Sequence, residues 1–343
     1  MPLVYDFDLP DFENYFRQIS QPVYRVKQLW TGLYRQLWYT PEAFTNLPGD
    51  LRQVLAETFS FSGLLPVDEL KSSDGETEKL LLKLYDGKSI ETVHMRYNDR
   101  QSICVSSQAG CAMGCVFCAT GQMGFKRNLS SGEIVEQVIH FARRLRTEDK
   151  PVTNVVIMGM GEPFNNYDAT MDAIRRLNHP EGMGLGQRRF TISTVGVVPG
   201  IIKFAEADSQ VNLAVSLHAA NDDLRSSLLP VNRTYPLAEL MQACKYYIDK
   251  TNRRITFEWA LIDGINDHEK DARELAGYLK GLLAHVNLIL LNPTHKYTGK
   301  ASTSSKARIF CETLESSSIA CTIRLRRGID IMAGCGQLAE KST

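Results

Sequence analysis

The chain has 343 residues, 43% of them hydrophobic, and its 39 basic residues balance 39 acidic ones. This length can bury a large core, and zero net charge argues against a protein that coats nucleic acid through a general positive field, so any RNA contact must be local. The acidic N-terminus and the lack of an apolar run near the roughly 20 residues that span a bilayer predict a cytoplasmic protein with no membrane contact.

The first part of the chain has the spacing of short amphipathic helices. Tyr24, Leu29, Trp30 and Tyr34 recur at helical intervals, and a turn signal at residues 72–75 closes the segment. We therefore predict a helical accessory domain over residues 1–75. A β-hairpin extension over residues 76–100 should follow, because two strand patterns flank the turn pair Asp86-Gly87.

From residue 101 onward, strand patterns alternate with helical patterns in six successive pairs. The predicted strands are residues 102–106, 154–158, 190–194, 211–217, 255–261 and 286–291, and the predicted helices are residues 131–145, 167–177, 200–207, 237–249, 269–282 and 304–316. Such alternation indicates a parallel sheet covered by helices. We predict an α/β fold, a partial (βα)6 barrel similar to a TIM barrel, over residues 101–343.

Three closely spaced cysteines, Cys111, Cys115 and Cys118, follow the first of these strands. A structural zinc site normally has four side-chain ligands, and a ferredoxin-type cluster has four thiolates. Three close cysteines therefore indicate an iron-sulfur cluster with one iron open to a substrate or cofactor. The alternative is a zinc site completed by a distant ligand, which would make the chain a non-catalytic, zinc-stabilised RNA-binding module.

Small and polar residues also follow the later strands, where a barrel of parallel strands places its reactive face. They are Gly161, Glu162, Ser193, Ser216, Leu217, His218 and Asn292. Each has a structural alternative: the serines could simply end strands, Leu217 could belong to the core, and His218 could be an interior histidine. Their gathering at one end of the barrel would be odd for a structural zinc site and favours an active site.

Four segments together resemble the RlmN/Cfr family of radical S-adenosylmethionine (SAM) adenine methyltransferases. They are residues 104–111, residues 111–129, residues 159–163 and residues 330–338. The cysteine triad and the Met-Gly-Glu-Pro sequence are similar to the radical SAM superfamily in general, whereas Cys104 and the late Cys-Gly-Gln-Leu sequence narrow the resemblance. Pro163 and residues 122–125 resemble the RlmN branch more than the Cfr branch.

This resemblance implies a [4Fe-4S] cluster bound by the triad, with SAM chelated to the open iron and held by the residues at the strand ends. Cys335 matches the family's methyl-accepting cysteine, Cys104 its partner thiol, and Glu91 its proposed proton acceptor. Taken alone, Glu91 would be an ordinary solvated charge on a strand. The cysteines outside these motifs, Cys244, Cys311 and Cys321, are expected to be packing residues.

The implied reaction uses two SAM molecules per turnover. Cys335 would accept a methyl group from the first, and a 5′-deoxyadenosyl radical made from the second would remove a hydrogen atom from that methyl group. The carbon radical would add to adenine, after which Cys104 would attack the Cys335 sulfur and release methylated RNA. The resulting disulfide must be reduced, and a flavodoxin or ferredoxin would supply electrons to the cluster.

The RlmN branch implies methylation of carbon 2 of an adenosine in the peptidyl-transferase region of large-subunit (23S) rRNA before full ribosome assembly, and of an adenosine beside some tRNA anticodons. The alternative, the Cfr branch, implies carbon 8 of the same rRNA adenosine and antibiotic resistance. The family's usual Ala-Ala-Cys reads Ala333-Gly334-Cys335 here, and the glycine is expected to loosen the loop. We expect a monomer.

Basic clusters that could provide a local RNA contact occur at five places in the sequence. They are residues 126–127, 143–146, 188–189, 253–254 and 324–327. A single cluster is more often a solvated end of a helix or strand. Convergence of several basic residues on one rim would instead favour RNA binding.

Overall fold

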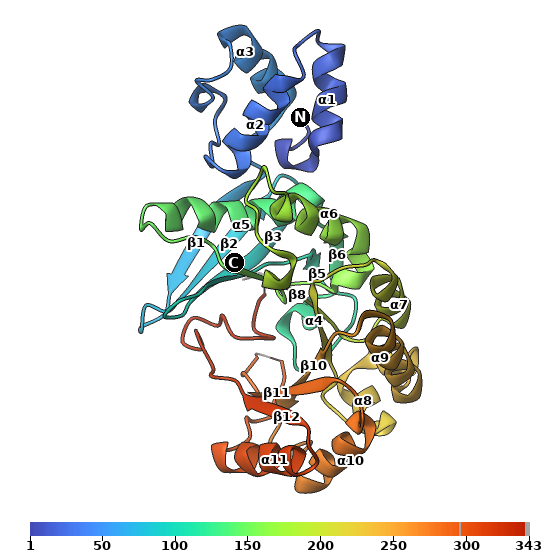
Figure 1. Cartoon of the computed structure of the whole chain (residues 1–343). Helices are drawn as coiled ribbons and strands as arrows, with labels where there is room; N and C mark the ends of the chain where they lie inside the picture. The colour runs from blue at the N-terminus through green and yellow to red at the C-terminus, as the bar shows by residue number, and fades with distance from the viewer. Residues whose placement is uncertain (295, 340–343) are drawn as a thin grey trace.

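A ten-stranded sheet is the central element of the computed structural model, which describes residues 1–294 and 296–339 (Figure 1). Its strand order is β1-β2-β3-β4-β7-β8-β9-β10-β11-β12. The strands are β1 (Leu64–Lys71), β2 (Thr77–Leu84), β3 (Ser89–Arg96), β4 (Gln101–Cys104), β7 (Asn154–Ile157), β8 (Phe190–Thr194), β9 (Asn212–Ser216), β10 (Ile255–Leu261), β11 (Ala284–Leu290) and β12 (Ala320–Ile323). A separate two-stranded sheet joins β5 (Gln108–Gly110) to β6 (Phe125–Asn128).

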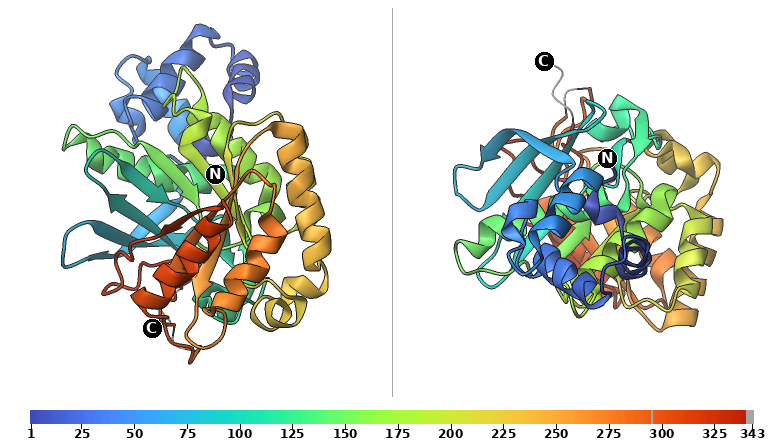
Figure 2. Two further views of the ribbon diagram at one scale, coloured as in Figure 1. Left: turned by 60° about the horizontal axis from the view of Figure 1, so that its bottom comes forward. Right: turned by 90° about the horizontal axis from the view of Figure 1, so that it is seen from above.

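Within the ten-stranded sheet, β4, β7, β8, β9, β10, β11 and β12 pair in parallel, and helices cover their outer side (Figures 1 and 2). The α-helices of the described residues, including those outside the barrel, are α1 (Leu9–Gln18), α2 (Tyr24–Tyr34), α3 (Gly49–Thr58), α4 (Ala119–Met123), α5 (Ser131–Arg146), α6 (Tyr167–Asn178), α7 (Val198–Glu206), α8 (Asp222–Leu228), α9 (Leu237–Thr251), α10 (Glu269–Leu279) and α11 (Ser304–Ser316). All six predicted strand and helix pairs are present, and the partial barrel is confirmed. Strand β12, which the sequence analysis missed, extends the parallel part by one strand.

Helices α1 to α3 form a separate lobe at one end of the molecule (Figure 1). Its core includes an edge-to-face cluster of aromatic rings, in which Phe59 lies 4.9 Å from Phe7 and 5.1 Å from Tyr15 between ring centroids. The lobe is attached to the barrel through Arg176 of α6, whose guanidinium donates to the carbonyls of Tyr5 (3.0 Å) and Asp6 (2.8 Å). These contacts fix the orientation of the lobe on the barrel.

The helical character predicted for residues 1–75 is wrong at its C-terminal end, because residues 64–71 form strand β1. This strand pairs antiparallel with β2 at the edge of the sheet, and the turn at residues 72–75 joins the two. Pro66 lies at an irregularity in the pairing, where a residue without an N–H is tolerated on an edge strand. The segment lacks a clean alternation of buried and exposed residues, so pairing with β2 supplies the order that its own pattern does not. The predicted hairpin of β2 and β3 is confirmed.

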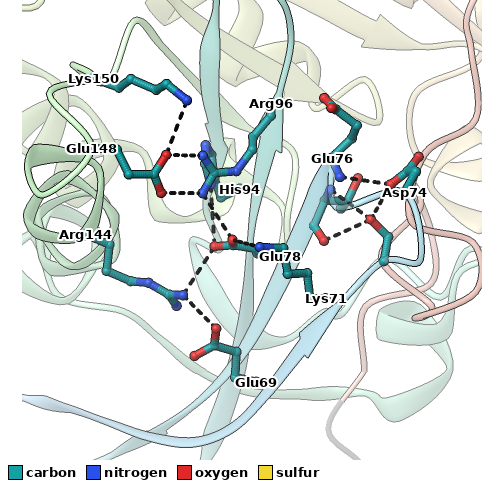
Figure 3. Close-up of polar contacts among 12 residues, drawn as sticks. Glu69, Lys71, Asp74, Glu76, Glu78, His94, Arg96, Arg144, Glu148 and Lys150 are labelled. Atoms are coloured by element: carbon teal, nitrogen blue, oxygen red, sulfur yellow. Dashed lines mark hydrogen bonds and ion pairs between the residues drawn. The ribbon is translucent and has the colours of Figure 1, made fainter.

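An ion-pair network fixes this antiparallel extension to the barrel (Figure 3). At its centre the buried Glu78 carboxylate lies 3.1 Å from the Arg96 guanidinium and 3.5 Å from that of Arg144, which belongs to α5. Contacts with His94, Arg144 and Arg96 lower the pKa of Glu78 to about 2. Glu78 is therefore ionised at neutral pH and holds β2, β3 and α5 together.

None of the helices in residues 1–294 and 296–339 combines the length and the apolar character that a bilayer span requires.

Candidate active site

Two cavities lie at the carboxyl ends of the parallel strands and meet at Cys335. The first, the cluster cavity, has a volume of about 170 Å³ and is lined by all three triad cysteines. The second, the thiol cavity, is lined by Cys104 and Cys335. Met158, Ile289, Asn292, Arg324 and Cys335 line both. The structure thus brings together cysteines that are 231 residues apart in the sequence (335 − 104).

The triad loop leaves strand β5 through a backbone that only glycine adopts easily. Gly110 and Gly114 have φ values of 74° and 65°, and a Cβ on Gly110 would lie 2.0 Å from the Gly124 carbonyl oxygen. Burial raises the pKa of the Cys111 thiol to about 12 and also raises the pKa values of Cys115 and Cys118. Ionised forms of these thiols therefore need a bound cation to balance their charge.

The donor set around the cluster cavity fits an iron-sulfur cluster with one open iron. Three buried or half-buried sulfurs of one loop line the cavity, and the fourth cysteine that lines it, Cys335, is exposed and belongs to a separate loop. Within the described residues, no group of three or more His, Cys, Asp or Glu side chains is already arranged closely enough to hold a metal ion. All three thiols line one cavity, which suits ligands of a single cluster.

Six of the seven predicted SAM contacts line the cluster cavity. They are Gly161, Glu162, Ser193, Ser216, His218 and Asn292. The seventh, Leu217, is completely buried and packs in the hydrophobic core, so its side chain is a packing group. Its backbone carbonyl accepts a hydrogen bond from Arg225 at 3.1 Å. Because the side chain is buried, any role of Leu217 at the strand end falls to its backbone.

Glu162 places a buried carboxylate between the ends of two neighbouring strands. One carboxylate oxygen accepts from the Val195 amide (2.9 Å), and the other accepts from the Phe164 amide (3.1 Å). Burial nevertheless raises the pKa of Glu162 to about 7, despite these two hydrogen bonds. A carboxylate held this way favours a ligand that brings its own positive charge, such as the amino group of SAM.

His218 is held as a neutral imidazole at the end of β9. The Ala260 amide donates to its Nδ1 atom at 2.9 Å, which leaves the proton on Nε2. Burial and the nearby Arg225 lower the pKa of His218 to about 3. Its φ of 59° is a strained backbone conformation for histidine, of the kind that clusters at functional sites.

Asn292 connects the cluster cavity to the loop that carries Cys335. Its side-chain amide donates to the Cys335 carbonyl at 3.1 Å, while its Oδ1 atom is buried without a partner among the described residues. An orphaned buried acceptor costs free energy, and a bound molecule with an N–H or O–H donor would satisfy it. A Cβ on Gly334 would lie 2.6 Å from the Asn292 amide nitrogen, so the glycine permits this close approach rather than simply loosening the loop.

The Cys335 loop is also tied to the triad loop. The Ala119 amide donates to the Gly336 carbonyl (2.7 Å), and the Thr120 hydroxyl donates to the Leu338 carbonyl (2.6 Å). Cys335 itself is exposed to the space between the two cavities. Its thiol is therefore accessible from the cluster side and from the Cys104 side.

Sequence reasoning missed two charged residues of the site. Arg324 follows β12 and lines both cavities; its charge interacts with Cys335, Glu258 and Cys104, and the first of these contacts does most to raise the pKa of Arg324. Glu258 is a buried carboxylate in β10, and its pKa is raised by burial. Both residues could have been singled out from the sequence, because Arg324 belongs to a basic run and Glu258 interrupts an apolar strand.

Cys104 is buried, and burial raises its pKa to about 12, with the nearby Cys335 as the second cause. The thiol is therefore protonated at neutral pH and needs a base or a nearby cation to become a nucleophile. Cys244, Cys311 and Cys321 are buried among core side chains, as predicted for packing residues.

Glu91 is not the solvated strand residue that its sequence context alone suggests. It is buried in β3, and one carboxylate oxygen lies 2.8 Å from the Lys79 ammonium. Its other oxygen accepts from the Ala339 amide at 2.8 Å, and Lys79 donates to the Met332 carbonyl at 3.1 Å. The Lys79–Glu91 pair therefore holds the Cys335 loop by hydrogen bonds on both sides of the cysteine. Glu91 itself lines neither cavity.

Comparisons with known proteins agree with this geometry. Residues 105–276 match the radical SAM superfamily. A dual-specificity RNA methyltransferase RlmN from Myxococcus xanthus is 50% identical over 92% of this chain and 88% of its own length. A probable dual-specificity RNA methyltransferase RlmN from Bacillus thuringiensis is 44% identical over 99% of this chain and 94% of its own. The chain belongs to the RlmN family.

A solved structure extends the match to the whole fold. The radical SAM methyltransferase from Sphaerobacter thermophilus is 50% identical, covers 98% of this chain and 99% of its own, and superposes with a TM-score of 0.97. Membership of the radical SAM superfamily implies a [4Fe-4S] cluster and SAM, which the triad and the cluster cavity suit. The RlmN-family assignment also makes this chain an enzyme, so the non-catalytic zinc module is excluded.

Lys79→Met is expected to destabilise this RlmN-family protein by about 3 kcal/mol, because it removes the ammonium group that lies 2.8 Å from the buried Glu91 carboxylate. Chemical denaturation monitored by circular dichroism measures this change. The double variant Lys79→Met/Glu91→Gln removes both charges and should recover most of the loss. Equal destabilisation of the single and double variants would show that Lys79 and Glu91 do not stabilise the fold as an ion pair.

Glu162 should give the folded protein a distinct pH dependence. Its folded pKa of about 7 lies above the ordinary value of 4.5, so its contribution to stability is fully present below pH 4.5 and is lost as pH rises through 7. Between pH 5 and 8 the wild type, measured without SAM, should lose up to about 3 kcal/mol more stability than Glu162→Gln. Denaturation curves at several pH values measure this difference, and parallel pH slopes would refute it.

Proposed function

We propose that this enzyme methylates carbon 2 of an adenosine in the peptidyl-transferase region of large-subunit rRNA, and an adenosine beside the anticodon of some tRNAs, through an S-methylcysteine at Cys335. The observation that carries the proposal is the position of Cys335 at the junction of the cluster cavity and the thiol cavity. The names of the relatives, dual-specificity RNA methyltransferases, support RNA as the substrate class.

Each side of Cys335 would then serve a different step. When bound at the triad, the cluster and two SAM molecules per turnover supply a methyl group and an organic radical. Glu162, Ser193, Ser216, His218 and Asn292 would hold the amino acid, ribose and adenine parts of SAM in the cluster cavity. The Asn292 amide also fixes the carbonyl of Cys335, so the same residue would align the bound SAM with the thiol that receives the methyl group.

Cys104 would complete the reaction from the thiol cavity. After the carbon radical has joined Cys335 to the adenine, the adduct must give up its ring proton and one electron, for which the bound cluster would be the acceptor. The Cys104 sulfur then attacks the Cys335 sulfur. A sulfur–sulfur bond forms as the carbon–sulfur bond breaks, and the carbon stays on the adenine as its new methyl group once it has taken up a proton. Two electrons from a reductant then restore both thiols. Arg324 is the nearby cation that would stabilise a thiolate at this step.

Glu91 is proposed to accept the proton that the adenine ring loses. Both of its carboxylate oxygens are engaged, by Lys79 and by the Ala339 amide. Proton transfer therefore requires the Ala339 contact to open, so that one oxygen can face the thiol cavity. We also predict a monomeric, cytoplasmic enzyme whose cluster is reduced by a flavodoxin or ferredoxin.

The test is anaerobic reconstitution with iron and sulfide, followed by incubation with SAM, a reductant and unmodified large-subunit rRNA or tRNA. Mass spectrometry of the digested RNA should detect 2-methyladenosine. Detection of 8-methyladenosine instead would assign the enzyme to Cfr-type chemistry. Formation of 5′-deoxyadenosine without methylated adenosine would show that the enzyme cleaves SAM and would refute the proposal that these RNAs are its substrates.

A further inference from the structure

Cys335 is open to two cavities, the cluster cavity and the thiol cavity. The triad and the SAM-contact residues line the cluster cavity, whereas Cys104 lines the thiol cavity. In the proposed reaction Cys104 must reach the Cys335 sulfur while the adenine is still attached to it. With the cluster and SAM in the cluster cavity, the thiol cavity is the other cavity that Cys335 lines, so the residues around its mouth are the ones placed to face the RNA.

Two segments that are distant in the sequence form this mouth. Residues 97–100 make a tight turn between β3 and β4, and residues 324–327 follow β12. The guanidinium carbon of Arg100 lies 4.2 Å from the centroid of the Tyr97 ring, and that of Arg327 lies 4.4 Å from the same centroid. One aromatic ring thus holds an arginine from each segment beside the opening.

The charge at this mouth is only partly neutralised. Arg327 lies 3.5 Å from the Glu76 carboxylate and donates to the Arg96 carbonyl at 3.0 Å. In the part of the chain that the structure describes, no carboxylate lies within 4.0 Å of the Arg100 or Arg326 guanidinium, and both residues are exposed. Residues 97–100 and 324–327 together carry four arginines and one acidic residue, Asp99, so positive charge is in excess beside the two reactive thiols.

Two of the other basic clusters contain an arginine that is held in ion pairs. Arg127 pairs with Asp86 and Glu133. Arg144 pairs with Glu69 in the network of Figure 3. Basic residues from two distant segments, 97–100 and 324–327, converge beside the thiol cavity, which the sequence alone could not show.

We propose that Tyr97, Arg100, Arg326 and Arg327, the arginine rim, bind single-stranded RNA on either side of the target adenosine. The inference rests on the proposed function and adds where the RNA lies. Guanidinium groups suit phosphate oxygens because they donate two parallel hydrogen bonds, and their flat faces stack on unpaired bases. The thiol cavity has a volume of about 50 Å³, less than a purine needs, so lining side chains such as the 80% exposed Leu325 must move when the base enters.

The test compares the reconstituted wild-type enzyme with Arg100→Gln/Arg326→Gln and with a control, Arg254→Gln/Arg308→Gln. The control removes two exposed arginines at the N-terminal end of β10 and on α11, outside both cavities. Fluorescence anisotropy measures the Kd for a labelled, unmodified single-stranded rRNA fragment that contains the target adenosine. Iron content and melting temperature show that each variant is folded.

The rim variant should raise Kd roughly tenfold at about 100 mM salt and reduce the slope of log Kd against log salt by about 1.4, or 0.7 for each of two lost phosphate contacts. KM for RNA should rise more than kcat falls. Tyr97→Phe should bind as the wild type does, because its ring keeps the stacking face, whereas Tyr97→Ala should weaken binding.

Three results would refute the proposal that the arginine rim binds RNA. They are an unchanged Kd in the double rim variant, an equal loss of affinity in the control, and full affinity in Tyr97→Ala. A wild-type enzyme that binds none of the RNA would instead refute the proposed function, and the rim with it.

Discussion

Cys335→Ser is expected to reduce RNA methylation by more than about a thousandfold, because a serine hydroxyl is a far poorer nucleophile than a thiol and cannot take part in disulfide exchange. The side chain is exposed between the two cavities, so the substitution should leave the fold and the cluster intact. Mass spectrometry measures methylated adenosine in the RNA and the methyl group on the intact protein. The wild type should carry the methyl group on Cys335, and the variant should carry none.

Two further cysteine variants separate the steps around Cys335. Cys104→Ser retains the methyl acceptor but cannot release the adenine, so RNA should accumulate as a covalent adduct with the protein. Cys311→Ala, in α11 and outside both cavities, is the matched control and should methylate RNA at the wild-type rate. Methylation of RNA by Cys335→Ser at an appreciable rate would refute the covalent route.

Cys115→Ala is expected to remove the cluster. Bound iron should fall from about four atoms per chain to nearly none, since two remaining thiolates cannot hold a cubane that already has only three protein ligands. SAM cleavage and methylation should be lost with it. Iron analysis, the visible absorbance of the anaerobically reconstituted protein and the yield of 5′-deoxyadenosine measure these effects.

The control for this experiment is Cys244→Ala, which truncates a buried cysteine of α9 outside both cavities. It should retain iron and activity even if its melting temperature falls, because its cost is a small cavity in the core. Full iron content in Cys115→Ala would show that this cysteine is not a cluster ligand.

The regular part of the fold was predictable because its signals are local. Each parallel strand from β4 to β11 is a short apolar run, and each following helix has one apolar face, so the alternation could be read residue by residue. Strands β1 and β12 lie at the two edges of the sheet. They were missed because an edge strand is only half covered and carries a weaker hydrophobic pattern, as the exposed side chains of β1 show.

The roles of particular side chains were less readable. Leu217 belongs to the core although it lies between two residues of the cluster cavity. Glu91 is buried against Lys79, a residue that no motif singled out. Charged residues on strands usually face solvent, so only the packing of the Cys335 loop over β2 and β3 shows why both charges are inside.

The sequence by itself determined the chemistry that the triad can support, because ligand type and spacing within one loop are local properties of the chain. It also placed the small and polar residues at strand ends, since the order of strands and helices follows from periodicity. Only the tertiary structure decided that Cys104 and Cys335 line one cavity, that Lys79 and Glu91 hold the Cys335 loop, and that residues 97–100 meet residues 324–327. Those contacts join segments more than two hundred residues apart, and their positions depend on sheet register and packing over the whole molecule.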